Sequence, residues 1–160
     1  MTCLAVHKHR QQVDAAIQQM EELLRIESVT IEQQGHVARY VCILVYGVLE
    51  NGIRSILSQF CGVRVLPHKR IADFIDRSLR YAPSPKVKNI LQQLGGFDAE
   101  WEKQMEAFLD GKIGDHISSI VNNRNLIAHG DQVGISLGAA KTYYESVKVF
   151  LDKLEEITGV

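Results

Sequence analysis

The segment Val41-Cys42-Ile43-Leu44-Val45-Tyr46-Gly47-Val48-Leu49 runs for nine residues without a charged or amide side chain. It lies within a longer stretch, from Thr30 to about Phe60, whose pattern fits one helix. A helix that is apolar nearly all round is buried on every side by other elements. The segment therefore predicts the long central helix of a bundle. Ser28 and Thr30 are the candidate N-caps of this helix, and Thr30 has capping-box spacing with Gln33. The helix is expected to end at Cys61-Gly62.

The rest of the chain has apolar residues at spacings of three and four, which is typical of helices, and no convincing strand pattern. This periodicity predicts further helices over residues 6–26, 67–81, 86–94, 98–109, 112–128 and 137–157. Pro67 suits the first turn of its helix, and Asp98 and Ser136 are expected N-caps. The apolar residues of the helix over 67–81 are expected to face inward: Ile71, Phe74, Ile75 and Leu79. We predict an all-α, single-domain helical bundle covering residues 1–160.

Length and composition are those of an ordinary soluble domain. A chain of 160 residues, 46% hydrophobic and 23% charged, buries roughly 70% of its unfolded surface without a disulfide. Three cysteines without CxxC spacing indicate reduced thiols, and hence a cytoplasmic protein. The N-terminal segment turns polar too early for a signal peptide. The longest apolar run, Val41 to Leu49, is far short of the ~20 residues that span a bilayer, so no membrane association is expected.

The net charge is −1, but the charges are unevenly distributed. From Arg64 to Lys88 there are seven basic and two acidic residues, a local charge of +5. From Asp98 to Asp115 there are six acidic and two basic residues, a local charge of −4. A basic surface can bind a polyanion, although a solvated helix face explains it equally well. The candidate RNA-binding residues are Lys69, Arg70, Arg77 and Arg80.

The helix predicted over 112–128, in the C-terminal half of the chain, runs into the sequence Asn122-Asn123-Arg124-Asn125-Leu126-Ile127-Ala128-His129-Gly130. Successive helix residues are about 100° apart, so Asn125 and His129 project from nearly the same face, while Arg124 diverges from His129 by about 140°. The length of arginine and a helix end at Gly130 still allow Arg124 and His129 to contact one phosphate. The structural alternative is that both side chains cap carbonyl groups and pair with acids such as Asp131.

Arginine, asparagine and histidine in this arrangement can cleave RNA without a metal or cofactor. The 2′-hydroxyl of a ribose attacks the adjacent 3′-phosphate, which yields a 2′,3′-cyclic phosphate and a 5′-hydroxyl. Arg124 would stabilise the charged phosphorane, Asn125 would orient the phosphate and His129 would transfer a proton. One histidine does not easily serve as both acid and base, so two copies of the motif in a symmetric dimer are expected.

The chain resembles HEPN domains, specifically the RiboL-PSP-HEPN branch, in the R-polar-x-x-x-H motif from Arg124 to His129. The segment from Tyr46 to Arg54 is similar to the central helix of that branch. The resemblance implies a homodimeric, metal-independent endoribonuclease, often a toxin of a toxin–antitoxin or phage-defence system. It also implies Arg124 and His129 as catalytic residues, Asn125 as a polar helper, and RNA and a cognate antitoxin as partners.

One position departs from the family pattern. Many HEPN toxins that pair with a nucleotidyltransferase antitoxin have a tyrosine two residues after the histidine, which the antitoxin modifies; this chain has Asp131 there. The resemblance therefore does not imply silencing by that route. Two other interpretations remain open: a non-catalytic helical module that binds RNA or protein, and an antitoxin-like or immunity protein whose acidic segment, Asp98 to Asp115, covers a basic effector.

Glu50 is a carboxylate in the most apolar helix, four residues before Arg54, which is the spacing of a helical ion pair. Alternatively, Glu50 or Asn51 holds Arg124 in position, so Glu50 is a candidate for supporting the motif. His7 and His9 have no partners at metal-ligand spacing, and no metal site is expected. The absence of GxxxxGK[ST], GxGxxG and HExxH argues against nucleotide-cofactor and zinc-protease chemistry.

Overall fold

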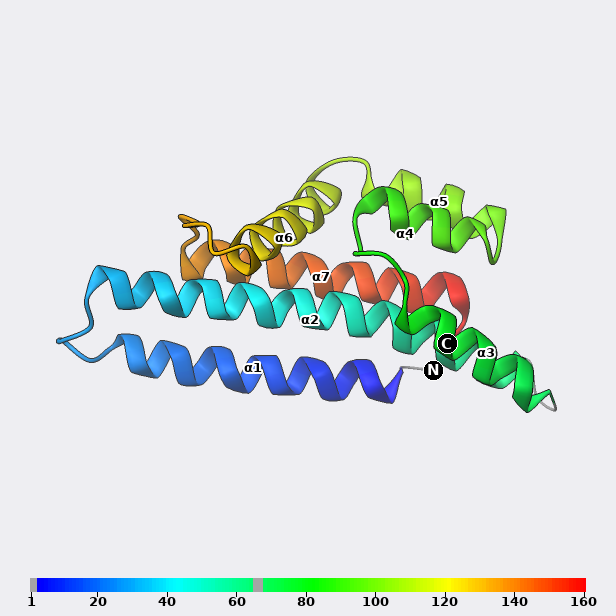
Figure 1. Ribbon diagram of the computed structural model, residues 1–160, viewed down its shortest axis with the longest axis horizontal. Helices are drawn as coiled ribbons and strands as arrows, with labels where there is room; N and C mark the ends of the chain where they lie inside the picture. The colour runs from blue at the N-terminus through cyan, green and yellow to red at the C-terminus, as the bar shows by residue number, and fades with distance from the viewer. Residues whose placement is uncertain (1–2, 65–67) are drawn as a thin grey trace.

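The computed structural model describes residues 3–64 and 68–160, which contain α-helices and no strand (Figure 1). The helices are α1 (Leu4–Leu24), α2 (Ile31–Arg64), α3 (Lys69–Arg80), α4 (Val87–Gly95), α5 (Ala99–Leu109), α6 (Lys112–Ala128) and α7 (Leu137–Thr158). The predicted all-α fold is confirmed, and α6 has the predicted bounds. Pro67, expected in the first turn of α3, lies outside the described residues.

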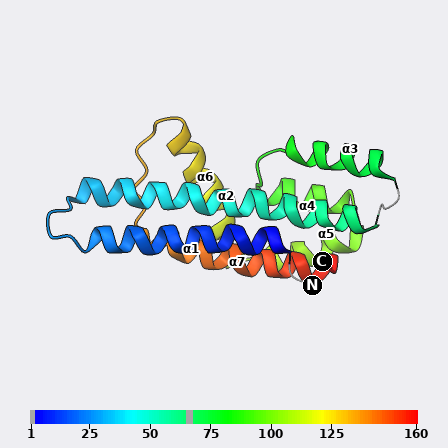
Figure 2. The same cartoon turned by 90° about the horizontal axis from the view of Figure 1, so that it is seen from below.

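Helix α2 is 34 residues long and forms the axis of the bundle. Helices α1 and α7 lie alongside it in both views, α6 crosses α2 and α7, and the α4–α5 pair packs on α6 and α7 (Figures 1 and 2). The central run is buried as predicted, with Val45 and Leu49 fully enclosed. The expected helix end at Cys61-Gly62 is wrong, because α2 continues to Arg64. Gly62 therefore lies inside the helix, where a glycine costs roughly 1 kcal/mol. The burial of the neighbouring Cys61 offsets this cost.

Side-chain caps set the starts of three helices, as predicted. Before α2, the Thr30 N–H donates to Gln33 Oε1 at 2.8 Å and the Gln33 N–H donates to Thr30 Oγ1 at 3.2 Å, which is a complete capping box. Asp98 Oδ1 accepts the Glu100 N–H at 2.7 Å before α5. Ser136 Oγ accepts the Ala139 N–H at 3.1 Å before α7. These bonds satisfy amide groups that have no partner within the helix.

Helix α3 differs from the sequence prediction in the direction of its apolar residues. Leu79 is buried and Ile75 is half-buried, but Ile71 is 50% exposed and Phe74 is 69% exposed. The reason is that α3 lies at the edge of the molecule and packs mainly on α2 (Figure 2). The apolar face of α3 is wider than the area that one neighbouring helix covers. The apolar residues outside that area therefore stay exposed.

By length and composition alone, α2 could also cross a membrane, since the stretch Ile31–Gly62 is long and apolar enough. The longest uninterrupted apolar run, Val41 to Leu49, is shorter than a membrane span, so the sequence alone did not indicate a membrane-spanning helix here. In the bundle, more than half of the most apolar window is buried against other helices. The core helix of a globular bundle has the same character.

Candidate active site

The motif lies where α6 ends and the chain turns towards α7. Ala128 is the last helical residue, and the backbone N–H of His129 still donates to Asn125 O at 3.0 Å. Gly130 has a φ of 84°, and its N–H donates to Ile127 O at 3.1 Å, while Asp131 N–H donates to Leu126 O at 3.0 Å. This pair of bonds is a Schellman motif, which requires the left-handed conformation that glycine adopts without strain. The predicted stop at Gly130 is confirmed.

Arg124 is held against the central helix by an aromatic ring. Its guanidinium carbon lies 4.7 Å from the centroid of the Tyr46 ring, and its Nη1 donates to Asn125 Oδ1 at 3.3 Å. Tyr46 belongs to α2 and is only 4% exposed, whereas Arg124 and Asn125 are half-buried. A cation above an aromatic face is attracted by the ring quadrupole. The structure therefore joins Arg124 and Asn125 by a hydrogen bond and places the cation against the central helix α2.

Tyr46 is the residue of this arrangement that sequence reasoning missed as a site residue. It lies within the apolar run that marks the core helix, where a tyrosine ring is usual, so its role as a support for Arg124 could not be distinguished from packing. The feature that could have indicated this role is the Tyr46 hydroxyl, because a buried tyrosine hydroxyl usually forms a hydrogen bond. Here Tyr46 OH donates to Glu50 Oε1 at 3.2 Å. Burial, followed by the nearby Glu50 carboxylate, raises the pKa of Tyr46.

Glu50 contacts the site through Tyr46. Among the described residues it forms neither the expected ion pair with Arg54 nor one with Arg124. Arg54 Nη2 instead donates to Asn51 Oδ1 at 2.8 Å, so Asn51 positions Arg54. The carboxylate of Glu50 is exposed and holds the ring on which Arg124 rests. Its role as a support for the motif stays a prediction, now with a defined contact.

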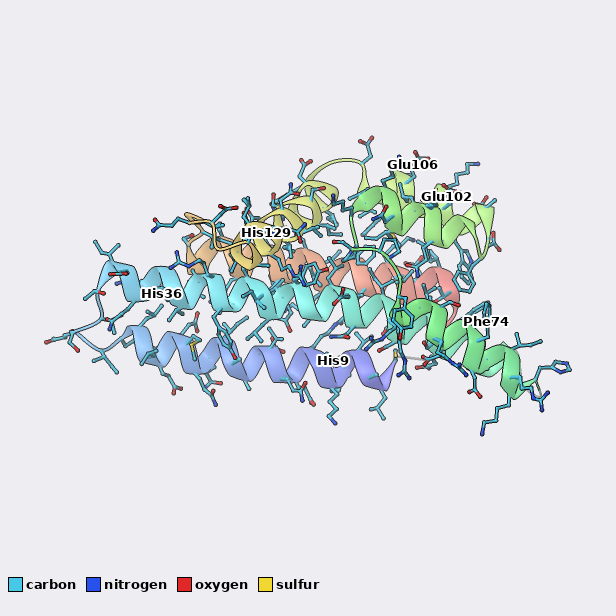
Figure 3. All side chains as sticks on the ribbon, viewed as in Figure 1. His9, His36, Phe74, Glu102, Glu106 and His129 are labelled. Atoms are coloured by element: carbon cyan, nitrogen blue, oxygen red, sulfur yellow. The ribbon has the colours of Figure 1, made fainter. Side chains whose placement is uncertain are left out.

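His129 is exposed at the end of α6 (Figure 3). In the described part of the chain its imidazole has no hydrogen bond and no ion pair, so the structural alternative of pairing with Asp131 is not formed. Arg124 and His129 are not hydrogen-bonded to each other either. One chain therefore offers a fixed guanidinium with a carboxamide beside it and, five residues on, a free imidazole at the surface.

The basic candidates lie on α3, away from the motif along α2 (Figure 1). Lys69, Arg70 and Arg77 are exposed and make no ion pair with a described residue. Arg80 is paired with Asp76 at 2.8 Å. Asp76 also accepts a hydrogen bond from Ser58 at 2.9 Å, and the Ser58 and Arg80 bonds lower the pKa of this carboxyl.

Two further lysines lie nearer to α6 and were not chosen from the sequence. Lys86 and Lys88, at the start of α4, line a pocket of about 250 Å³ together with Ser118 and Asn122 of α6. Asn122 opens the motif sequence. Sequence proximity grouped these lysines with the basic segment, but only the packing of α4 on α6 shows that they adjoin the motif helix.

Metal-ligating side chains do not gather in groups of three or more anywhere in residues 3–64 or 68–160. His116, on the same helix as the motif, has its Nδ1 2.7 Å from Ser146 Oγ and its ring against Tyr143, contacts that give this histidine a structural role. The free thiols of Cys3, Cys42 and Cys61 are buried, and burial raises the pKa of Cys42 to about 11. These thiols are poor nucleophiles.

The chain was compared with models of protein families, with curated proteins and with solved structures. Searches of curated proteins and of solved structures found no significant similarity. The model of the RiboL-PSP-HEPN family matches residues 12–159, a range that includes α2 and the complete motif. Since the match covers nearly the whole sequence, the chain belongs to the RiboL-PSP-HEPN family of HEPN domains.

Proposed function

We propose that this protein is a metal-independent endoribonuclease that cleaves RNA by attack of a ribose 2′-hydroxyl on the adjacent phosphate. Its products would carry 2′,3′-cyclic phosphate and 5′-hydroxyl ends. HEPN domains are often ribonucleases, and membership of the family supports an RNA-related nuclease function. The observation that carries the proposal is the fixed Arg124 cation beside Asn125, with an unpartnered imidazole at His129.

Each group has a task that its surroundings suit. Arg124 carries a permanent charge and a fork of donors, and its contact with Tyr46 limits its motion before substrate binds. Asn125 can donate to a phosphate oxygen through its amide while its own oxygen accepts from Arg124. His129 is exposed and free to transfer a proton.

A homodimer completes this proposal. Transesterification needs a base for the 2′-hydroxyl and an acid for the leaving oxygen, and each chain supplies one free imidazole at the motif. A two-fold axis near the end of α6 would place two copies of Arg124, Asn125 and His129 around one phosphate. We further propose that the protein acts in the cytoplasm as a toxin of a toxin–antitoxin or phage-defence system, restrained by a partner that does not modify a tyrosine after the motif.

The proposal is tested by incubating the purified protein with labelled total RNA and tRNA in EDTA, followed by analysis of the product ends. We expect cleavage with cyclic-phosphate and 5′-hydroxyl ends, and a loss of about 10²–10⁴-fold in rate for His129→Ala. Arg124→Ala should lose at least about 10²-fold, because it removes the charge that stabilises the phosphorane.

The matched control is His7→Ala, which removes an exposed histidine of α1 far from the motif sequence. Its cleavage rate should equal that of the wild type. Circular dichroism and thermal unfolding of each variant show whether the fold is kept. Strict dependence on a divalent metal, or equal cleavage by wild type and His129→Ala, would overturn the mechanism. Tight RNA binding without any cleavage would instead favour a non-catalytic RNA-binding module.

A further inference from the structure

A groove between α3 and α4 combines exposed aromatic rings with carboxamides. It has a volume of about 490 Å³ and is lined by Phe74 and Ile75 of α3, by Tyr81 and Pro83 of the following turn, and by α4. Phe74 is 69% exposed and Tyr81 is 86% exposed. Figure 3 shows Phe74 on α3 at the opposite end of the long axis from His36. The groove therefore presents two large aromatic rings to solvent, of which Phe74 was expected to face inward.

The chain around the groove is positively charged. From Lys69, where α3 begins, to Phe97 there are six basic residues and two acidic ones, Asp73 and Asp76, which gives a local charge of +4. The groove lining itself contains no charged side chain. Arg80 is paired with Asp76, but other cations around the groove are exposed. The surroundings therefore favour a ligand with a negatively charged backbone, and the uncharged lining favours flat or apolar groups inside the groove.

The wall formed by α4 is suited to nucleobases. It contributes the carboxamides of Asn89, Gln92 and Gln93. Asn89 is held in place, because its Nδ2 donates to Ser84 O at 2.8 Å. A carboxamide presents both a donor and an acceptor, which is the pattern on the edges of nucleobases. An apolar protein segment would leave such groups without partners.

We propose that this groove binds unpaired bases of an RNA strand, with bases stacked on Phe74 and Tyr81 and base edges against Gln92 and Gln93. Arg77 is exposed and directly precedes Ser78 of the groove lining, so its cation is available to a phosphate there. Stacking on aromatic rings with cations along the backbone is the common design of single-strand binding sites. A regular duplex does not fit this design, because its bases are stacked on one another and not available.

A second pocket leads from the groove towards the motif, and this part of the inference rests on the proposed ribonuclease function. A smaller pocket of about 110 Å³ shares Leu79, Asn89 and Gln93 with the groove and reaches Glu50 and Arg54 on α2. Glu50 in turn binds the hydroxyl of Tyr46, on whose ring Arg124 rests. Tyr46 and Arg54 are eight residues apart on one helix, about 12 Å. Within this proposal, a strand whose bases occupy the groove runs along α2 in the direction of Arg124.

The test measures RNA affinity in the cleavage-deficient His129→Ala background, by fluorescence anisotropy of a short labelled single-stranded RNA of mixed sequence. Phe74→Ala and Tyr81→Ala should each weaken binding by between about fivefold and a hundredfold, which corresponds to the loss of one stacked base. Phe74→Tyr and Tyr81→Phe should bind like the parent protein, because they keep the ring. The matched control is Tyr40→Ala, which removes an exposed tyrosine of α2 outside the groove.

Two comparisons make the outcome decisive. A duplex of the same sequence should bind at least about tenfold more weakly than the single strand. Unchanged affinity in both alanine variants, or equal binding of duplex and single strand, would overturn the proposal. If both variants bind RNA normally but lose self-association by analytical ultracentrifugation, the groove is an interface between copies of this chain and the proposal is wrong.

The cleavage assay of the wild-type protein is scored separately. Weaker RNA binding by the Phe74 and Tyr81 variants supports the groove even if the wild-type protein cleaves nothing. Conversely, normal cleavage and normal binding by these variants would reject the groove and leave the ribonuclease function standing.

Discussion

At the scale of single residues, the site depends on how Arg124 is held. A free arginine samples many rotamers, and ordering it costs up to about 2 kcal/mol of side-chain entropy. In this protein the Tyr46 ring and the Asn125 oxygen hold the guanidinium before any ligand arrives. The Tyr46 ring is itself held by burial and by its bond to Glu50. We therefore interpret Tyr46 as a positioning residue for the proposed cleavage.

Substitution of Tyr46 separates its ring from its hydroxyl. Tyr46→Phe keeps the aromatic face under Arg124, so cleavage should stay within about threefold of the wild type, since a cation–π contact depends on the ring. Tyr46→Leu removes that face, and kcat should fall by about tenfold with KM changed less, because the cation is no longer oriented for the transition state.

Steady-state cleavage kinetics and thermal unfolding of both variants check this prediction. Glu50→Gln is the companion variant, because glutamine keeps an acceptor for the Tyr46 hydroxyl, and its activity should match that of the wild type. A purely structural role for Tyr46 would lower the unfolding temperature of Tyr46→Leu while leaving kcat per folded molecule unchanged.

At the scale of elements, the end of α6 determines where His129 is placed. Gly130 has a φ of 84°, and a Cβ there would cost about 1 kcal/mol because the left-handed conformation is strained for other residues. Gly130→Ala should therefore lower the free energy of unfolding by about that amount. It should also reduce cleavage, because the Schellman bonds that fix the chain after His129 would be disturbed.

Urea unfolding and the cleavage rate measure both effects. Gly134→Ala is a matched control in the same connection, since Gly134 has no positive φ and no atom lies within 4 Å of an added Cβ. It should leave both quantities unchanged. Equal stability of the two variants would show that the left-handed turn is not what holds the helix end.

The elements also show which parts of the structure the sequence can predict. The bounds of α6 and the capping box at Thr30 followed from local rules, because helix starts and stops depend on residues a few positions apart. The exposed Phe74 and the role of Tyr46 did not follow. Both depend on which helices pack together: α3 has one main neighbour, and α6 crosses α2 at the level of Tyr46. Periodicity identifies an apolar face but not the area of the surface that will cover it.

At the scale of the whole molecule, one chain carries half of the proposed catalytic groups. The described residues of a single chain offer one Arg124, one Asn125 and one free imidazole at the end of α6. General acid and general base catalysis by histidine needs two imidazoles in opposite protonation states at the same phosphate. If the second comes from a partner copy, activity belongs to the dimer and depends on both chains being intact.

Mixed dimers test this dependence. Wild-type and His129→Ala protein are mixed at a constant total concentration and allowed to exchange subunits, and the cleavage rate is measured against the wild-type fraction. If both imidazoles serve one site, only dimers with two wild-type chains are active, so an equal mixture should retain about a quarter of the wild-type activity. If each chain cleaves alone, the same mixture should retain about half. Dilution with His7→Ala protein should leave the rate unchanged, because that variant keeps the motif intact. A linear dependence on the wild-type fraction would reject the shared site and require a second proton-transfer group within the same chain.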